Sequence, residues 1–212
     1  MCTGRVDLEF VLRAFSNGTD GVFIGGCRLG ECNYSTQGNY HALTMVLLCK
    51  KILEYLRLNP QRLRIEFMSS ADGVLFTEVV NDFVKQIKGL GPLGSNEGID
   101  AKGLKLKLEA ASSIVPYIRL VERERLRVRF TKKEEYEQYF ASDEANKLFN
   151  ELIADRLAIS QIMILLRDKL LSTSEIAEIL GLSSSQVSKY LRSSAREGLI
   201  RFDEKEKRFA SV

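Results

Sequence analysis

The segment Gly21-Val-Phe-Ile-Gly-Gly-Cys-Arg-Leu-Gly-Glu-Cys-Asn-Tyr34 decides the fold of this chain. It begins with a short apolar run, residues 21–25, which predicts a buried β-strand. A glycine-rich turn with two thiols, Cys27 and Cys32, follows that strand. Glycines let such a turn fold tightly and point backbone amides at a bound sulfur. The segment therefore predicts a strand that delivers two cysteines to a site.

Helices and strands alternate around this turn. A second strand is expected at residues 63–68, where side chains alternate in character. Helical spacing predicts helices at residues 7–16, 40–56 and 71–88, the last one capped by Ser69 and Ser70. Alternating strands and helices with short connections predict a parallel sheet with helices on its faces. The expected fold class of residues 1–88 is therefore α/β.

The remainder of the chain predicts a linker and a second domain. Residues 89–103 contain five glycines and a proline, which favours a linker. A charged helical segment follows to residue 140, so residues 89–140 form the predicted connection between the two domains. Within it, residues 121–130 fit either a helix or a strand. In residues 141–212, Ser172 and Glu175 form a capping-box pattern before a helix. Two helices, a glycine turn and a strand pair in this order predict an α-rich winged helix-turn-helix domain.

Composition and charge exclude several classes of protein. The chain has 212 residues and a net charge of +3, so overall basicity does not point to nucleic acid. It contains no apolar run of about 18 residues that would suggest a membrane span. The first residues lack the pattern of a secretory signal. We therefore expect a cytoplasmic protein with reduced thiols, for which metal or redox chemistry is more typical than structural disulfides.

The cysteines are the candidate ligands. Cys27 and Cys32 have the Cys-x4-Cys spacing found in iron–sulfur proteins. Cys2 also precedes a glycine and a helix, as expected where the loops of a parallel sheet converge. The alternative is that all three are ordinary small buried residues. Cys49 lies in an apolar helical stretch and is expected in the core.

The single histidine, His41, gives weaker evidence. It is expected to have a structural or surface role, although a position near the thiols stays open. No serine or cysteine pairs clearly with it, so a hydrolytic triad has little support. The sequence also lacks a phosphate-binding loop and a dinucleotide-binding fingerprint.

Four segments together carry a family resemblance: Met1–Asp7, Asp20–Tyr34, Gly38–Tyr40 and Leu63–Gly73. In order and spacing, up to about Lys88, they resemble the delta subunit of methyl-viologen-reducing hydrogenase, the small iron–sulfur subunit associated with heterodisulfide reductase. The resemblance implies a non-catalytic electron-transfer subunit of an oxidoreductase complex, with a [2Fe–2S] cluster. Its partners would be a hydrogenase or formate dehydrogenase and the flavin-containing, A-type component of heterodisulfide reductase. By position, Cys2, Cys27 and Cys32 match the cysteines of the family, and they are the implied ligands.

Two departures from the family leave alternatives open. Members normally have an upstream strand with a Cys-x-x-Cys-like segment, whereas this sequence starts at Met1, so we expect an N-terminally truncated copy. Three matched thiols leave one ligand of a [2Fe–2S] cluster unassigned. The start can be misassigned, a separate chain can supply the segment, or the chain can be a cluster-free scaffold subunit. The second departure is the tail, because the resemblance does not extend to residues 104–212.

The tail suggests a second function. The segment from Ser183 to Arg192 resembles the recognition helix of winged-helix regulators. Possible DNA-binding residues are Gln186, Lys189, Arg192, Lys207 and Arg208. The alternative is a winged helix that binds protein, which the acidic residues of the expected wing favour. The second hypothesis for the function is therefore a redox-responsive winged-helix DNA-binding regulator, and the first is the electron-transfer subunit. Under both hypotheses we expect no membrane partner.

Overall fold

Two short parallel strands, β1 (Val22–Gly26) and β2 (Leu63–Phe67), form the sheet of the first part of the chain. They pair in register from Val22–Leu63 to Gly26–Phe67. The computed structural model describes residues 2–34 and 37–212 of the chain. Met1, where the predicted first domain begins, lies outside these residues. The α/β class with a small parallel sheet is confirmed.

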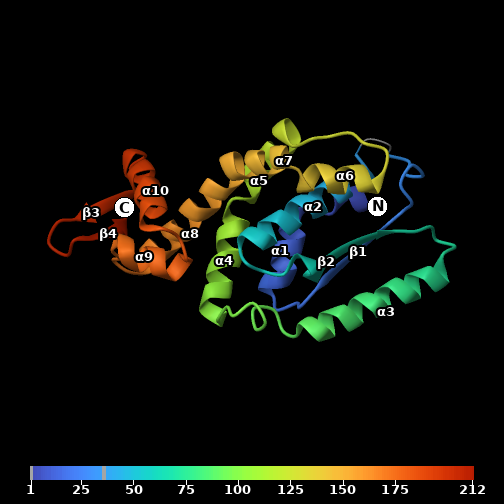
Figure 1. Ribbon diagram of the computed structural model, residues 1–212, viewed down its shortest axis with the longest axis horizontal. Helices are drawn as coiled ribbons and strands as arrows, with labels where there is room; N and C mark the ends of the chain where they lie inside the picture. The colour runs from blue at the N-terminus through green and yellow to red at the C-terminus, as the bar shows by residue number, and fades with distance from the viewer. Residues whose placement is uncertain (1, 35–36) are drawn as a thin grey trace.

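Helices lie on both faces of this sheet (Figure 1). On one face are α1 (Leu8–Ser16) and α2 (Asn39–Tyr55), and on the other is α3 (Gly73–Leu90). Short 3-10 turns, η1 (Thr3–Arg5) and η2 (Pro60–Arg62), precede α1 and β2. The predicted capping of α3 by Ser69 and Ser70 is wrong. The helix begins after Asp72. The Asp72 carboxylate accepts from the Ser69 N–H and the Ser69 hydroxyl accepts from the Ala71 N–H, so Ser69 belongs to a turn that precedes the helix.

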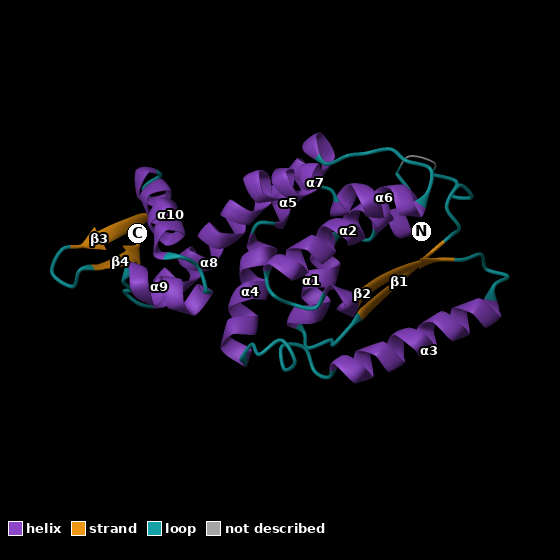
Figure 2. Ribbon diagram, in the orientation of Figure 1, coloured by secondary structure: helices purple, strands orange, loops and turns teal. Residues whose placement is uncertain are grey.

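The rest of the chain is helical up to a terminal hairpin (Figure 2). Its elements are α4 (Ala101–Ser113), α5 (Val115–Arg125), α6 (Lys133–Ala141), α7 (Asp143–Phe149), the π-helical turn η3 (Asn150–Ala154), α8 (Asp155–Asp168), α9 (Thr173–Leu180), α10 (Ser184–Arg196), β3 (Ile200–Asp203) and β4 (Arg208–Ser211). Residues 121–130, which fit a helix or a strand, are helical to Arg125 and irregular beyond it.

Two hydrophobic cores organise these elements. The first extends from Leu8 to Leu157 and includes side chains of α4, α5 and α6 together with those of α1 and α2. The second extends from Ala158 to Ile200. The first core therefore continues past residues 88 and 140, where the sequence predicts boundaries.

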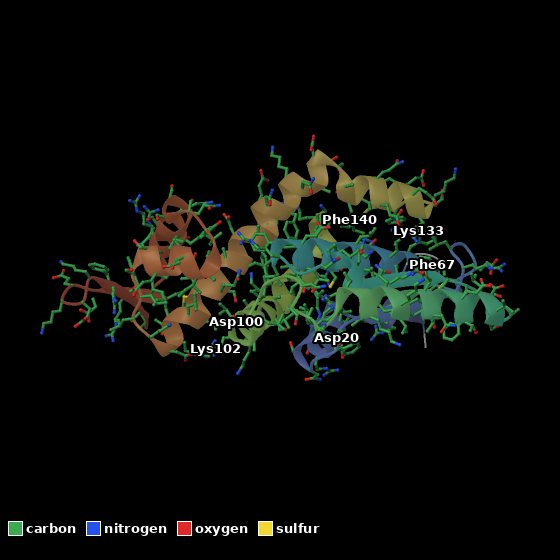
Figure 3. The ribbon with its side chains drawn as sticks, turned by 60° about the horizontal axis from the view of Figure 1, so that its bottom comes forward. Asp20, Phe67, Asp100, Lys102, Lys133 and Phe140 are labelled. Atoms are coloured by element: carbon green, nitrogen blue, oxygen red, sulfur yellow. The ribbon has the colours of Figure 1, made fainter. Side chains whose placement is uncertain are left out.

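Arg62 holds the segment that follows α3. Its guanidinium is fully buried and donates to the Glu97 carboxylate, with an Nε–Oε1 distance of 2.6 Å. It also donates to the backbone carbonyls of Asp20, Leu90, Gly91 and Pro92. The Asp20 carboxylate, labelled in Figure 3, accepts from the Leu93 N–H at 2.7 Å. This bond also joins the residues before β1 to the segment after α3. The first part of the predicted linker is thus packed against the sheet domain.

The terminal unit follows the order that its sequence predicts. The Ser172–Glu175 capping box starts α9, which ends at Gly181 in the left-handed conformation, with φ of 64°. Ser183 caps α10 with Gln186, and β3 pairs antiparallel with β4. Within the described residues, no helix is long and apolar enough to cross a bilayer.

Replacing Arg62 with methionine should lower the free energy of unfolding by about 3–5 kcal/mol, because it leaves the Glu97 carboxylate buried without its partner. Urea denaturation followed by circular dichroism measures the change. Arg119→Met is the matched control. The Arg119 ion pairs with Asp7 and Glu9 are partly exposed, so its loss should cost less than about 1 kcal/mol. Equal losses in the two variants would contradict the assigned role of Arg62.

Candidate functional site

Three cysteines converge at the carboxyl end of β1. Cys2 occupies the N-cap of η1, Cys27 directly follows β1, and Cys32 lies in the next turn. The sulfurs of Cys2 and Cys32 are 3.5 Å apart. All three side chains are half-buried free thiols. Residues far apart in the sequence therefore supply thiols to one edge of the sheet.

Asn39 fixes the loop that carries Cys27. Its side chain is fully buried, and Nδ2 donates to the carbonyls of Cys27 and Arg28 at 2.8 and 2.7 Å. The same nitrogen lies 3.7 Å from the Cys27 sulfur. Its Oδ1 is buried and has no hydrogen-bond partner among the described residues. Asn39 thus ties the first turn of α2 to the cysteine loop and leaves one polar atom unsatisfied beside it.

Glycines create the space in which the thiols meet. A Cβ atom on Gly38 would lie 2.3 Å from the Cys32 sulfur, and one on Gly4 would lie 2.2 Å from a backbone carbonyl oxygen. Gly30 has a φ of 85°, which the turn between Cys27 and Cys32 requires. Larger residues at Gly4 or Gly38 would therefore push the loops apart.

The surroundings give the thiols different acidities. Burial raises the pKa of Cys32, but the backbone amides of Tyr34 and Asn39 and the neighbouring thiols lower it overall. Burial, together with the neighbouring Cys32 and Cys2, raises the pKa of Cys27. A thiolate, the form that ligates metal, is thus stabilised first at Cys32.

Two contacts fasten the cysteine loop to the rest of the domain. Arg28 makes a bidentate ion pair with Asp72 at the start of α3, with Nη2 2.8 Å from Oδ1. The Thr3 hydroxyl donates to the Gly25 carbonyl at 2.9 Å. The site is therefore connected to η1, β1, α2 and α3.

The other candidate residues lie away from the thiols. Cys49 is fully buried in α2, where burial raises its pKa to about 12, and its predicted core position is confirmed. The Nδ1 atom of His41 lies 3.2 Å from the Glu122 carboxylate, a contact that raises the histidine pKa. His41 thus pairs with α5.

The five possible DNA-binding residues lie on α10 and the terminal hairpin. Gln186 is part of the helix cap, and Lys189 pairs with Asp155 at 2.7 Å. Arg208 pairs with Glu175 at 2.9 Å. Arg192 is exposed on α10, and Lys207 is exposed in the turn between β3 and β4. Three of the five thus also have contacts within the chain.

The donor set of the cysteine site is made only of thiols, which favour zinc, copper(I) and iron–sulfur clusters. Two thiolates on one tetrahedral metal, with bonds of about 2.3 Å, lie roughly 3.8 Å apart. The Cys2–Cys32 separation of 3.5 Å fits such a pair. Across residues 2–34 and 37–212, no group of three or more His, Cys, Asp or Glu side chains is arranged around a single ion. The thiols therefore fit a soft metal ion or an iron–sulfur cluster as a class.

Known proteins match this part of the chain. A family model described as methyl-viologen-reducing hydrogenase, delta subunit, matches residues 1–91. The vhu iron-sulfur subunit of the F420-non-reducing hydrogenase of Methanopyrus kandleri is 42% identical over 92 residues, which are 43% of this chain and 69% of that protein. The chain belongs to the methyl-viologen-reducing hydrogenase delta subunit family.

Other relatives of this delta-subunit family member fall into two kinds. The iron-sulfur subunit of the F420-non-reducing hydrogenase of Archaeoglobus profundus is 46% identical over 91 residues, 43% of this chain and 66% of that protein. The A-type subunit of the ferredoxin/F(420)H(2)-dependent CoB-CoM heterodisulfide reductase of Methanosarcina acetivorans is 42% identical over 95 residues, 45% of this chain but 12% of that protein. The chain thus spans about two thirds of one relative and a small part of the other.

The tail of this delta-subunit family member matches a different model. The model is described as bacterial regulatory protein, arsR family, and covers residues 160–201, from α8 to the start of β3. The second hydrophobic core includes the same elements. The chain therefore combines a delta-subunit domain with a helix-turn-helix unit.

Sequence reasoning missed two residues of the site. It considered the glycines of the turn that carries Cys27 and Cys32, whereas a Cβ on Gly38 would make the close approach to a cysteine sulfur. It gave no role to Asn39, which contacts the Cys27 loop. The Gly38-Asn39-Tyr40 motif was the available signal.

Replacing Gly38 with alanine should separate Cys2 from Cys32, because the new methyl group would overlap the Cys32 sulfur. Diamide oxidation of the metal-free chain, with the Cys2–Cys32 disulfide followed by peptide mass spectrometry, should then be several-fold slower than in the wild type. Gly73→Ala is the matched control, since its Cβ would meet no atom within 4 Å. Unchanged oxidation of the Gly38 variant would contradict this account of the loop.

Proposed function

We propose that this chain is an electron-transfer subunit that holds a [2Fe–2S] cluster at Cys2, Cys27 and Cys32. The observation that carries the proposal is the convergence of these thiols, with the sulfurs of Cys2 and Cys32 3.5 Å apart. The names of the relatives, which call them iron-sulfur subunits, support the cluster class.

The thiols can serve as ligands of a two-iron cluster. Each iron of a [2Fe–2S] cluster takes two protein ligands, so thiolates are needed in pairs and not as a group of four around one point. Cys2 and Cys32 have the separation of such a pair, and Cys27 supplies a third thiolate. A fourth ligand is not assigned among the described residues. When bound, the cluster would accept and release single electrons.

The residues of the chain would hold and tune such a cluster. The amides of Tyr34 and Asn39 favour negative charge on Cys32, and the Gly4 N–H lies 3.4 Å from the Cys2 sulfur. Amides that point at ligand sulfurs stabilise the more negative, reduced state and raise the reduction potential. Asn39 would keep the Cys27 loop in place through changes of charge.

The two kinds of relative suggest the partner. The same stretch of sequence occurs in a small hydrogenase subunit and within the A-type subunit of a heterodisulfide reductase. A domain that occurs in one protein as a separate subunit and in another as part of a larger chain is expected to bind that larger chain. We therefore infer that the electron acceptor is a flavoprotein of the heterodisulfide reductase A type. The electron donor would be a hydrogenase or a formate dehydrogenase, and the complex would be cytoplasmic.

Anaerobic reconstitution of the chain with iron and sulfide should produce visible absorption and an electron paramagnetic resonance signal after reduction. Cys27→Ser or Cys32→Ser should abolish both signals, because each removes a ligand. Cys49→Ser is the control and should retain both, since Cys49 lies in the core away from the site. A colourless wild-type chain would favour the cluster-free scaffold.

DNA binding by the terminal unit is a second candidate function. The exposed face of α10 carries Ser185, Lys189, Arg192 and Arg196 at helical spacing. Arg192 and Arg196 form no ion pair with any described residue, and the arsR-family match covers α10. Such a stripe suits contacts with phosphates and base edges in a major groove. The Lys189–Asp155 pair, at 2.7 Å, opposes this use of Lys189.

Arg192→Ala should weaken binding of the chain to duplex DNA and reduce the slope of log affinity against log salt by about 1, because one phosphate contact is lost. Lys189→Ala should have a smaller effect, since Asp155 already engages that side chain. Fluorescence anisotropy at several salt concentrations measures both, with Lys85→Ala on α3 as the control. Absence of binding at low salt, with the site oxidised or reduced, would exclude this function.

A further inference from the structure

We propose that Cys2 and Cys32 form a reversible disulfide in the metal-free chain, by thiol–disulfide exchange with a low-molecular-weight disulfide. The pair is then a site of oxidative modification as well as part of a metal site. Oxidation withholds two thiols from a metal, so the site becomes available only after reduction. The disulfide does not require that the chain transfers electrons, and it can be tested separately from the proposed function.

The two sulfurs already lie close enough for exchange. They are 3.5 Å apart, and a disulfide bond of about 2 Å requires them to approach by roughly 1.5 Å. Neither Cys2 nor Cys32 lies within a helix or a strand, so small rotations of the backbone and side chains can bring the sulfurs together. Figure 1 shows the N-terminal end of the chain beside the loop that follows β1.

Cys27 is a neighbour of the same sulfurs, but its backbone is anchored on both sides. It directly follows β1, and Asn39 donates to its carbonyl at 2.8 Å. The next residue, Arg28, makes a bidentate ion pair at the start of α3. These contacts oppose the movement that a bond to Cys27 would need. Cys2 is therefore the expected partner of Cys32.

A small disulfide can reach the turn that carries Cys32. The residues around it in the sequence, Glu31, Asn33 and Tyr34, are exposed, and Cys32 itself is half-buried. Cys49, in contrast, is fully buried in α2. A reagent in solution therefore meets the thiols of the site and not the thiol of the core.

The exchange is balanced by the two cysteines and the small disulfide alone. The Cys32 thiolate attacks one sulfur of the small disulfide, which gives a mixed disulfide and one small thiol. The Cys2 sulfur then attacks the Cys32 sulfur and releases the second small thiol. Two electrons pass from the cysteines to the small disulfide, and the two cysteine protons end on the small thiols. An excess of small thiol reverses both steps.

The disulfide and a bound metal exclude each other. The thiolate is the form of cysteine that ligates metal, and a sulfur in a disulfide bond is no longer a thiolate. Of the three thiols at the site, the disulfide leaves Cys27 alone. The redox state of the Cys2–Cys32 pair therefore decides whether the site can take up a metal ion or a cluster.

The test uses the full-length chain, freed of metal by a chelator under reducing conditions. Mixtures of oxidised and reduced glutathione set the redox state, acid stops the reaction, and the remaining thiols are alkylated. Mass spectrometry of the intact chain and of its peptides then locates each bond. Cys49→Ser is the control, because Cys49 lies in the core away from the site, and it should oxidise within twofold of the wild-type rate.

We expect oxidised glutathione to convert the wild type into a form that lacks two hydrogens, with Cys2 linked to Cys32 and Cys27 alkylated. Cys2→Ser should accumulate at least tenfold more glutathione adduct on Cys32, because it lacks the nucleophile of the second step. Circular dichroism checks the fold of this variant, and serine is itself a good N-cap. A wild-type disulfide to Cys27, or glutathione adducts without an internal disulfide, would overturn the proposal.

Zinc binding tests the exclusion of metal by the disulfide. Thiolates favour Zn²⁺, and competition with a chromogenic chelator measures its affinity. The oxidised chain, separated from glutathione, should bind Zn²⁺ at least tenfold more weakly than the reduced chain, and equal affinities would overturn the exclusion. A reduced chain that forms the disulfide but stays colourless with iron and sulfide would overturn the electron-transfer function and support this inference.

Discussion

The buried Arg62–Glu97 pair is the interaction on which the arrangement of the first domain depends. A guanidinium without solvent contact needs a partner for each N–H group, and here one carboxylate and four backbone carbonyls supply them. These partners lie just before β1 and at the end of α3 and the segment after it. A single side chain therefore fixes the residues that lead into β1 relative to the residues that follow α3. The segment after Glu97 then leads into α4, whose side chains complete the first core.

The cysteine site uses the opposite end of the same strands. Because β1 and β2 run parallel, their carboxyl ends lie together, and the loops that leave them meet η1 there. Asn39, in the first turn of α2, donates to the carbonyls of Cys27 and Arg28 and so holds the cysteine loop against α2. Its Oδ1 atom is buried and has no hydrogen-bond partner among the described residues. Such an unsatisfied atom beside three thiols is typical of a site whose geometry serves a function and not only stability.

A second link connects the sheet domain to the terminal unit. Helix α2, about 25 Å long, begins at Asn39 beside the thiols and ends close to Arg57, which donates to the Gly181 carbonyl in the turn before α10 at 3.2 Å. Asp155, at the start of α8, accepts from both Lys189 and Tyr190 of α10. The helix-turn-helix unit is thus attached to the first core by polar contacts as well as by the continuous α7–η3–α8 helix.

The sequence by itself determined the elements and the types of residue in the site. A continuous apolar run predicted β1, alternation of apolar and polar residues predicted β2, and helical spacing predicted the helices around them. Ser172 with Glu175 predicted the start of α9. These signals act over a few residues. Tertiary structure decided what depends on distant partners. Only the folded chain shows that Arg62 turns an expected linker into packed structure, that Gly38 makes room for the Cys32 sulfur, and that Cys2 meets Cys32 across 30 residues. Burial and close packing between segments far apart in the chain leave no local pattern, so these features emerge only when the segments are brought together.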